Sequence, residues 1–298
     1  MDGLIPIDKP SGWTSHDVVL KVRACLGELR VGHFGTLDPL ATGLLLIAVG
    51  QATRFFPFYS RADKSYRGRL RLGLATDTYD AQGSPAGPEC LDLPSGDELR
   101  AAMGGFRGAI LQAPPVFSAK KIQGQPSYKL ARNQKAVPLR PQQVTVHVFS
   151  LEEFEPPRAE FFVSCTSGTY IRSLVHDLGI LLGCGAHLES LRRLSSGEHR
   201  LEQAFGIEDI ERMAGRGEHA RFLEPLDSLL PGLPALTLSE SGFPAAKNGK
   251  KLSDADFAAG LPAAGPGIFR LFRPDGKLIA LARRDADSSL LHPFLVLP

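Results

Sequence analysis

The order of apolar and polar residues in the first part of the chain predicts a helix followed by a buried strand. Apolar positions three and four residues apart after Ser15 predict a helix with Ser15 as its N-cap and Gly27 at its end. Gly43 and Gly50 bound the continuous apolar run Leu44–Val49, which is too short for a typical helix and predicts a buried strand.

Alternation with a period of two predicts further strands. The sequence "SYRGRLRLG" places Tyr66, Leu70 and Leu72 on one side, with arginines on the other, which predicts a half-buried strand with a basic exposed face. The segment "VTVHVFSLEEF" alternates in the same way, and "AEFFVSCTS" predicts another strand. The arginines of the first strand are Arg67, Arg69 and Arg71.

Apolar residues at helical spacing occur between these strands and after them. The cap "PSGDELR" opens a predicted helix over Asp97–Met103, and a clearer amphipathic helix follows "SGTY". Strands separated by helices and long insertions predict a mixed α/β or α+β fold. The apolar positions of the second helix are Ile171, Leu174, Val175, Leu178, Leu181 and Leu182.

The C-terminal part of the chain has a different pattern. The composition changes over Leu223–Pro234, which predicts a linker. Beyond it, two short apolar stretches flank Asp275 and Gly276, a dipeptide typical of a hairpin turn. The pattern therefore predicts that residues 235–298 form a small, separate β-rich domain.

Length and composition exclude several classes of protein. The chain has 298 residues, of which 43% are hydrophobic and 22% charged, as expected of a globular protein with a large core. The N-terminus lacks the basic start and apolar run of a signal peptide, and "GLLLIAVG" is far shorter than the ~18 residues of a membrane span. We expect a cytoplasmic protein without membrane contact.

The four cysteines are widely spaced and form no C-x-x-C pair. This spacing makes a structural zinc site and a disulfide framework implausible, so we expect reduced, mostly buried thiols and no metal. The cysteines are Cys25, Cys90, Cys165 and Cys184.

Positive charge is concentrated in one part of the chain. The net charge is only +2, but residues 101–150 hold seven basic side chains and no acidic one. Such a concentration predicts a surface that binds a polyanion, and the alternative is a solvated basic loop without a partner. The seven are Arg107, Lys120, Lys121, Lys129, Arg132, Lys135 and Arg140.

Asp38, in "GTLDPLATG", is the first candidate for chemistry. Pro39 biases Asp38 toward an extended backbone and so narrows where its carboxylate points. This stretch alone fits three interpretations of Asp38: a turn or cap residue, a metal ligand, and a rigidly held reacting group. The metal ligand is the least favoured, because the His and Cys residues of the chain do not have the spacing of a metal site.

Other candidates lie in separate segments. Arg172 follows Tyr170 at the junction of a strand and a helix, where a guanidinium can reach a carboxylate such as that of Asp38 and keep it ionised. The alternative is a surface arginine, in a poor position relative to the helix dipole. Tyr66 is either a core aromatic or a stacking platform, and His33 is either an exposed turn residue or a side chain that fills the space of a displaced base.

Together these segments resemble one family, the bacterial TruB-type tRNA pseudouridine synthases. The resemblance covers residues 3–200, and residues from about 235 on are similar to the family's C-terminal PUA-like RNA-binding domain. The matching motifs, in order, are "GLIPIDKPSGWTSHDVV", "GHFGTLDPLATGLLLIAVGQATRF", "DKSYRGRLRLGLATDTYDAQG", "PPVFSAKKIQGQPSYKLAR" and "CTSGTYIRSLVHDLGILLGCGAHLESLRRL".

The resemblance implies an α+β fold in which a central mixed or antiparallel sheet is flanked by helices. It implies a catalytic domain over residues 1–230, with a basic insertion near 114–140 that grips RNA, and a PUA-like domain over 235–298. Asp38 matches the catalytic aspartate, Arg172 its arginine partner and Tyr66 the tyrosine that stacks on the base. The implied substrate-binding residues are His33, Tyr170, Leu194, Lys120, Lys121, Lys129 and Arg132.

The implied reaction breaks the bond from ribose C1′ to uracil N1 and joins C1′ to C5, without a cofactor. The implied substrate is a uridine in the T-arm of tRNA, at position 55, bound by a monomer without an obligate protein partner. Attack of Asp38 on C1′, attack on C6 and removal of a sugar proton remain open. Alternatives are a non-catalytic RNA-binding protein, a relative guided by a separate RNA, and a phosphatase or glycosidase, which would need a second acid or a metal cluster.

Overall fold

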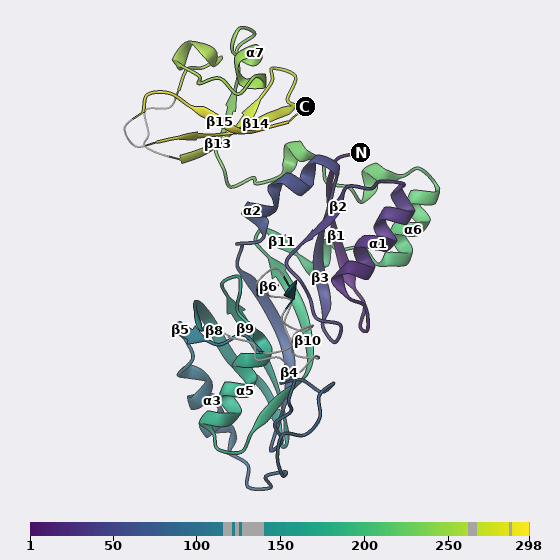
Figure 1. The fold of residues 1–298 in the computed structure, drawn as a ribbon, viewed down its shortest axis with the longest axis vertical. Coiled ribbons are helices and arrows are strands. Elements are labelled where there is room, and N and C mark those ends of the chain that lie inside the picture. Colours follow the sequence, from purple (N-terminus) through teal and green to yellow (C-terminus); the bar gives the residue numbers. More distant parts are fainter. Residues whose placement is uncertain (116–120, 123–124, 127–139, 262–266, 286–287, 298) are drawn as a thin grey trace.

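The computed structural model describes residues 1–115, 121–122, 125–126, 140–261, 267–285 and 288–297. Within these residues, a nine-stranded mixed sheet runs in the order β1-β3-β10-β4-β9-β8-β5, with β2 beside β3 and β11 beside β10 (Figure 1). The α+β class and the central sheet predicted from the sequence are confirmed. The strands are β1 (Gly3–Lys9), β2 (Val31–Phe34), β3 (Thr42–Val49), β4 (Lys64–Leu72), β5 (Gly108–Gln112), β8 (Gln142–Glu155), β9 (Arg158–Cys165), β10 (Ala186–Ser196) and β11 (His199–Arg200).

Strand β10 joins the two halves of this sheet. It pairs along its length with β4 in antiparallel fashion but meets β3 in parallel at only two positions, Arg192 with Thr42 and Arg193 with Gly43. A Cβ at position 43 would lie 2.4 Å from the carbonyl oxygen of Arg193, and the backbone there has φ +96°. Only glycine allows the two strands to approach so closely.

Helices cover the sheet on either side of this junction. Helix α3 packs on β8 and α5 on β10, and α1 and α6 pack together beside β1 and β2 (Figure 1). The main core lies between sheet and helices and includes Leu45, Leu70, Phe161 and Leu174. The helices are α1 (Ser15–Leu26), α2 (Phe56–Tyr59), α3 (Gly96–Gly104), α5 (Ile171–Leu181), α6 (Ile207–Gly215) and α7 (Gly242–Lys247).

Helix α1 begins one residue earlier than predicted. Thr14, not Ser15, is the N-cap, and it forms a capping box with Asp17. Ser15 is instead buried in the first turn, where its hydroxyl accepts a hydrogen bond from the Leu37 amide (2.8 Å) and lies 3.1 Å from the Leu37 carbonyl. The prediction chose the wrong member of two adjacent hydroxyl residues because either can cap a helix.

The exposed face of β4 carries arginines, as predicted, but it is not a basic surface. Each arginine forms an ion pair with a glutamate, so the positive charge of this strand is locally neutralised. The face is also opposite to Tyr66, because side chains alternate along a strand. The pairs are Arg67–Glu152, Arg69–Glu160 and Arg71–Glu89, with N···O distances of 2.5–2.7 Å.

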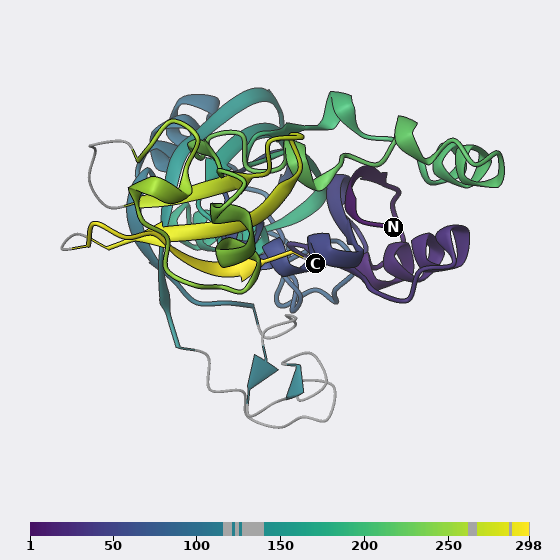
Figure 2. The same ribbon diagram turned by 90° about the horizontal axis from the view of Figure 1, so that it is seen from above.

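A second, four-stranded sheet follows in the order β12-β13-β14-β15, and α7 packs on it. The predicted hairpin is confirmed, because β13 and β14 are antiparallel and Gly276 has φ +84°. Figure 2 views the molecule from the end that carries this sheet. The strands are β12 (Ala235–Thr237), β13 (Gly267–Phe272), β14 (Leu278–Arg284) and β15 (His292–Val296); β6 (Lys121–Ile122) and β7 (Gln125–Pro126) form a separate pair.

The four-stranded sheet packs directly on the N-terminal part of the chain. The Arg54 guanidinium donates to the carbonyl of Val296, and the rings of Phe58 and Phe294 lie 6.3 Å apart. The preceding connection is also packed, because Glu224 exchanges backbone hydrogen bonds with Leu4 at the edge of β1. None of the helices in the described ranges has the length and apolar character that a membrane crossing requires.

Candidate active site

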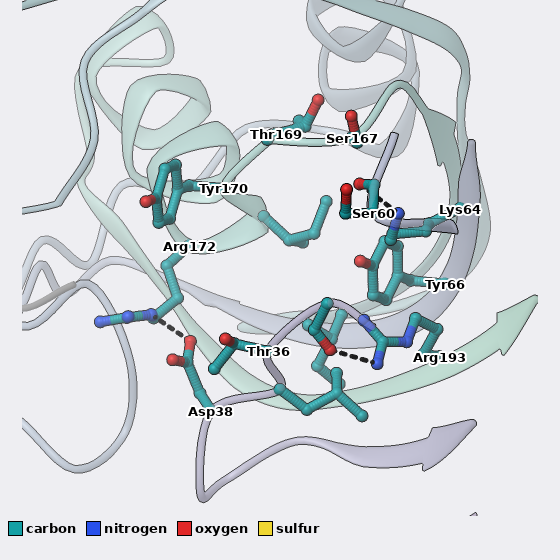
Figure 3. Close-up of a pocket in the computed structure, with 15 residues that line it drawn as sticks. Thr36, Asp38, Ser60, Lys64, Tyr66, Ser167, Thr169, Tyr170, Arg172 and Arg193 are labelled. Atoms are coloured by element: carbon teal, nitrogen blue, oxygen red, sulfur yellow. Dashed lines mark hydrogen bonds and ion pairs between the residues drawn. The ribbon is translucent and has the colours of Figure 1, made fainter. Parts of the chain in front are cut away.

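A cavity of about 330 Å³ opens where the loop between β2 and β3 meets β4, β10 and the start of α5 (Figure 3). Four residues predicted from the sequence line it: Asp38, Tyr66, Tyr170 and Arg172. Figure 3 shows Asp38 and Arg172 on one side, with Tyr66, Lys64 and Arg193 on the other. Segments far apart in the sequence therefore meet around one space.

The carboxylate of Asp38 is held in place through its two neighbours. Ser15 binds the backbone of Leu37, and the carbonyl of Pro39 accepts a hydrogen bond from the Gly12 amide at 2.8 Å. The Asp38 side chain itself is 41% exposed. The backbone is thus anchored on both sides, while the carboxylate stays accessible to a ligand in the cavity.

Arg172 connects Asp38 to a second acid that the sequence did not single out. Its Nε donates to Asp38 Oδ2 at 2.8 Å, which is the expected pairing, and its Nη1 donates to the Thr78 carbonyl at 3.0 Å. The same Nη1 lies 3.4 Å from Asp80 Oδ2. Arg172 and Asp80 are only 6% and 7% exposed. Because the guanidinium is planar and buried between these partners, its orientation toward Asp38 is fixed.

Arg193 supports the opposite wall of the cavity. Its side chain is 1% exposed, and its guanidinium donates to the carbonyls of Leu44 (2.6 Å) and Gly35 (3.0 Å). Tyr66 lies beside it, and burial raises the pKa of the Tyr66 phenol despite the nearby cation. The hydroxyl is therefore protonated at neutral pH, with its ring forming a wall of the cavity.

Lys64 adds a third buried cation. Its Nζ donates to the carbonyls of Ala62 (2.6 Å) and Ser60 (3.4 Å), and burial lowers its pKa from 10.5 to about 8. With Arg172 and Arg193, it gives three bases against one acid, Asp38, among the described residues that line the cavity. Such a balance favours an anionic ligand, for example a nucleotide that carries a phosphate.

The buried Lys64 predicts that stability rises above pH 8. An unfolded lysine keeps its proton up to ~10.4, so between these pH values the unfolded chain binds more protons and the free energy of unfolding increases with pH. From pH 7.5 to 9.5, the free energy of unfolding should increase by about 2 kcal/mol more in the wild type than in the Lys64→Met variant. Urea unfolding at the two pH values measures this difference, and equal rises in both proteins would contradict it.

Tyr170 is positioned by a buried amide. Gln112 is 2% exposed; its Nε2 donates to the Tyr170 carbonyl at 3.0 Å, and its Oε1 accepts from the Tyr170 amide at 2.7 Å. This reciprocal pair fixes the backbone at the N-cap of α5. The start of α5, with Arg172 in its first turn, is thereby anchored to the end of β5.

Two family models match the chain. One is described as the TruB family pseudouridylate synthase N-terminal domain and matches residues 23–171; the other is the tRNA pseudouridylate synthase B C-terminal domain and matches residues 172–231. The chain belongs to the TruB family. Among curated relatives, tRNA pseudouridine synthase B of Solibacter usitatus is 44% identical over 86% of this chain and 88% of the relative. The same-named protein of Geobacter sulfurreducens is 41% identical over 95% and 93%.

Solved structures support the TruB-family fold. A Cbf5-Nop10-Gar1 complex contains a chain with a TM-score of 0.74 and 27% identity, covering 99% of this chain and 84% of that one. A chain in an archaeal box H/ACA Nop10-Cbf5 complex matches with the same TM-score at 24% identity, covering 99% of this chain and 86% of that one. These matches extend over both sheets.

The other residues implied by the TruB-family resemblance are not gathered at the cavity. His33 lies in β2, and Leu194 lies in β10; neither is among the described residues that line the cavity, whereas Leu191 is. Burial lowers the pKa of His33, so its ring is neutral. Lys120, Lys129 and Arg132, and the side chain of Lys121, lie outside the described residues.

Sequence reasoning missed Lys64, Arg193, Leu191 and the buried Asp80. Lys64 had a usable signal, because it precedes Tyr66 by two residues on one strand and must share its face. Among the described residues no group of three or more His, Cys, Asp or Glu side chains is arranged to hold a metal ion.

Proposed function

We propose that this chain converts uridine to pseudouridine in the T-loop of tRNA, at position 55. Membership of the TruB family supports the proposal, as do relatives named tRNA pseudouridine synthase B at 41–44% identity. The observation that carries it is the pairing of Asp38 with Arg172 beside a cavity in which basic side chains outnumber acidic ones. The surrounding cations favour a negatively charged substrate and offset its repulsion by the carboxylate.

The reaction needs a carboxylate at a fixed point near the sugar and base. The C1′–N1 bond breaks, the uracil turns, and C1′ bonds to C5, while C5 loses a proton and N1 gains one. An aspartate is ordinarily ionised at neutral pH, so Asp38 needs positioning rather than activation. Attack on C1′, attack on C6 and removal of a sugar proton all require the carboxylate at this place.

The remaining lining residues have roles that follow from their positions. The target uridine must leave its stack, at a cost of a few kcal/mol. The Tyr66 ring offers a stacking surface across the cavity from Asp38, and Lys64 and Arg193 supply positive charge near the sugar–phosphate backbone. Because the Tyr66 phenol is protonated, we propose stacking as its main contribution. His33 fills the space that the base leaves, and Tyr170, which lines the cavity, contacts the nucleotide.

The proposal assigns RNA contacts to two further parts of the chain. Residues 1–230 form the catalytic domain, whose basic insertion near 114–140 grips the T-arm through Lys120, Lys121, Lys129 and Arg132. Residues 235–298 form a PUA-like RNA-binding domain. The enzyme acts as a monomer in the cytoplasm and needs neither a cofactor nor a protein partner.

Tritium release from a tRNA transcript labelled at uridine C5 tests this function with the purified chain alone. C5 loses its hydrogen when it bonds to C1′, so release reports the isomerisation directly. We expect the released tritium to reach about one equivalent per tRNA. Carbodiimide modification and primer extension should then map the pseudouridine to the T-loop. Tight tRNA binding without release would instead identify a non-catalytic RNA-binding protein.

The basic insertion predicts a strong dependence of tRNA binding on salt. Reversing the charge at Lys120, Lys121 and Lys129 should weaken binding and flatten the plot of log K against log[salt] by about 0.7–0.9 for each phosphate that is no longer neutralised. Filter-binding titrations at several salt concentrations measure the slope.

A charge-matched variant is the control for this experiment. It carries the same change in net charge on the α1 and α6 side of the molecule, so long-range effects of charge are equal while the insertion is intact. If both variants show the same slope, the insertion does not contact RNA. The control residues are Lys21, Arg212 and Arg221.

A further inference from the structure

Tyr79 has an unusual backbone conformation next to the active-site arginine. Its φ is +65°, and among the described residues only one other non-glycine residue, Leu230, has a positive φ. A bulky side chain rarely adopts this left-handed conformation, because its Cβ then crowds the following carbonyl. Such strain persists only where surrounding contacts impose it, and it is concentrated at functional sites.

The residues on either side of Tyr79 both contact Arg172. Thr78 supplies the carbonyl, and Asp80 the buried carboxylate, that face Arg172 Nη1. Asp80 is itself oriented, because its Oδ1 accepts from the Thr78 hydroxyl (2.7 Å) and the Gln82 amide (3.0 Å). The left-handed turn at Tyr79 therefore lets the residues before and after it face the same guanidinium.

The side chain of Tyr79 ties this turn to the helix that carries Arg172. Its ring stacks on His176 with centroids 3.7 Å apart and planes 12° from parallel. His176 follows Arg172 by four residues on α5, so both side chains lie on one face of the helix. The backbone of Tyr79 is held as well, because its carbonyl accepts from the Leu188 amide of β10 at 3.0 Å.

We propose that the stacked pair of Tyr79 and His176 positions Arg172, and through it Asp38, for catalysis. The inference rests on the proposed function and adds two positioning residues to it. Neither side chain lines the described part of the cavity, so neither touches the substrate there. The stack therefore gives the loop that contains Thr78 and Asp80 a hold on α5 that does not depend on the guanidinium it orients.

The geometry leads to a specific expectation for turnover and binding. A guanidinium that can shift relative to Asp38 misplaces the carboxylate, and a misplacement of 1 Å can lower a rate by about a hundredfold. The basic groups that hold the RNA remain, so affinity is unaffected. A pair that only stabilises the fold would lower the melting temperature without changing the rate of the folded enzyme.

Two substitutions at Tyr79 separate these roles. Asparagine accepts a left-handed backbone but has no ring, whereas phenylalanine keeps the ring and loses only the hydroxyl. In single-turnover assays with saturating enzyme, we expect Tyr79→Asn to react about tenfold to a hundredfold more slowly. The tRNA affinity of Tyr79→Asn should stay within about twofold of that of the wild type. The rate of Tyr79→Phe should likewise stay within about twofold of the wild-type rate.

A double-mutant cycle with His176→Ala tests whether the two rings act as a pair. If they do, the double variant reacts no more slowly than Tyr79→Asn alone, because one substitution has already removed the stack. Leu230→Asn is the matched control, since it replaces the other left-handed side chain far along the chain from Arg172. It should change thermal stability but not the rate.

Each alternative result overturns the positioning role. A Tyr79→Asn enzyme that reacts at the wild-type rate, or additive rate losses at Tyr79 and His176, would show that the stack does not orient Arg172. Circular dichroism at the assay temperature tests whether each variant is folded. Failure of the wild type to release tritium would instead refute the proposed function, so the two failures are distinguishable.

Discussion

Asp38→Asn should abolish pseudouridine formation while leaving tRNA affinity within about twofold of the wild type. The substitution keeps the size of the side chain and can still accept a hydrogen bond from Arg172 Nε, but it removes the negative charge that attack on C1′, attack on C6 and removal of a sugar proton all need. We expect the rate to fall by at least about 10⁴-fold, as when the nucleophile of a covalent catalyst is removed. Tritium release under single-turnover conditions measures the rate, and filter binding measures affinity.

Asp8→Asn provides the control for this variant. Asp8 is also an aspartate paired with an arginine, Arg192, at 2.6 Å, but it is not among the described residues that line the cavity. Its substitution should leave the rate close to that of the wild type. Measurable turnover by the Asp38→Asn enzyme, beyond that of a blank without protein, would refute the catalytic assignment.

Arg172→Lys should have the second-largest effect on the rate. A lysine keeps the positive charge but cannot donate from a rigid plane to Asp38, the Thr78 carbonyl and Asp80 at once. We expect single-turnover tritium release to be slower by about a hundredfold, because the carboxylate is no longer fixed. Arg172→Ala should in addition lose roughly 3–5 kcal/mol of stability, since Asp80 would be buried without a cation.

Arg192→Lys separates the loss of an ion pair from the loss of this particular geometry. The Arg192–Asp8 pair has exposed fractions of 43% and 35%, and such exposed pairs contribute at most about 1 kcal/mol. The control should therefore be nearly as stable and as active as the wild type. A wild-type rate for Arg172→Lys would show that the planar guanidinium is not needed to position Asp38.

Regular patterns in the sequence predicted most of the elements that surround the site. Strands β3, β4 and β8 alternate or run apolar without interruption, and the spacing of α5 is regular, so local periodicity was sufficient. Strand β10 was not predicted, although it lies in the middle of the sheet. Its register shifts between Leu188 and Ser190 and again between Arg193 and Ser195, and each shift breaks the period of two on which the prediction depends.

Because β10 was not predicted, the residues that it contributes to the cavity were missed as well. Leu191 and Arg193 are two residues apart and both line it, whereas Leu194 is offset by one position. Local sequence already marked Asp38, Tyr66 and Arg172 as candidates and suggested that Arg172 reaches the carboxylate of Asp38, and the family resemblance then assigned the three to one site. Asp80 lies 92 residues before Arg172, counting from 80 to 172, and only the fold shows that the two are paired.

The position of β10 has a consequence for how the protein is synthesised. Strands β3 and β4 are neighbours in sequence but are separated in the sheet by β10, which is made more than a hundred residues later. Until β10 leaves the ribosome, the edge of β4 that β10 covers stays open, the kind of surface on which nascent chains associate incorrectly, whereas β3 is already flanked by β1 and β2. The walls of the cavity close only when β10 inserts, so a partly synthesised chain has no complete site with which to capture RNA.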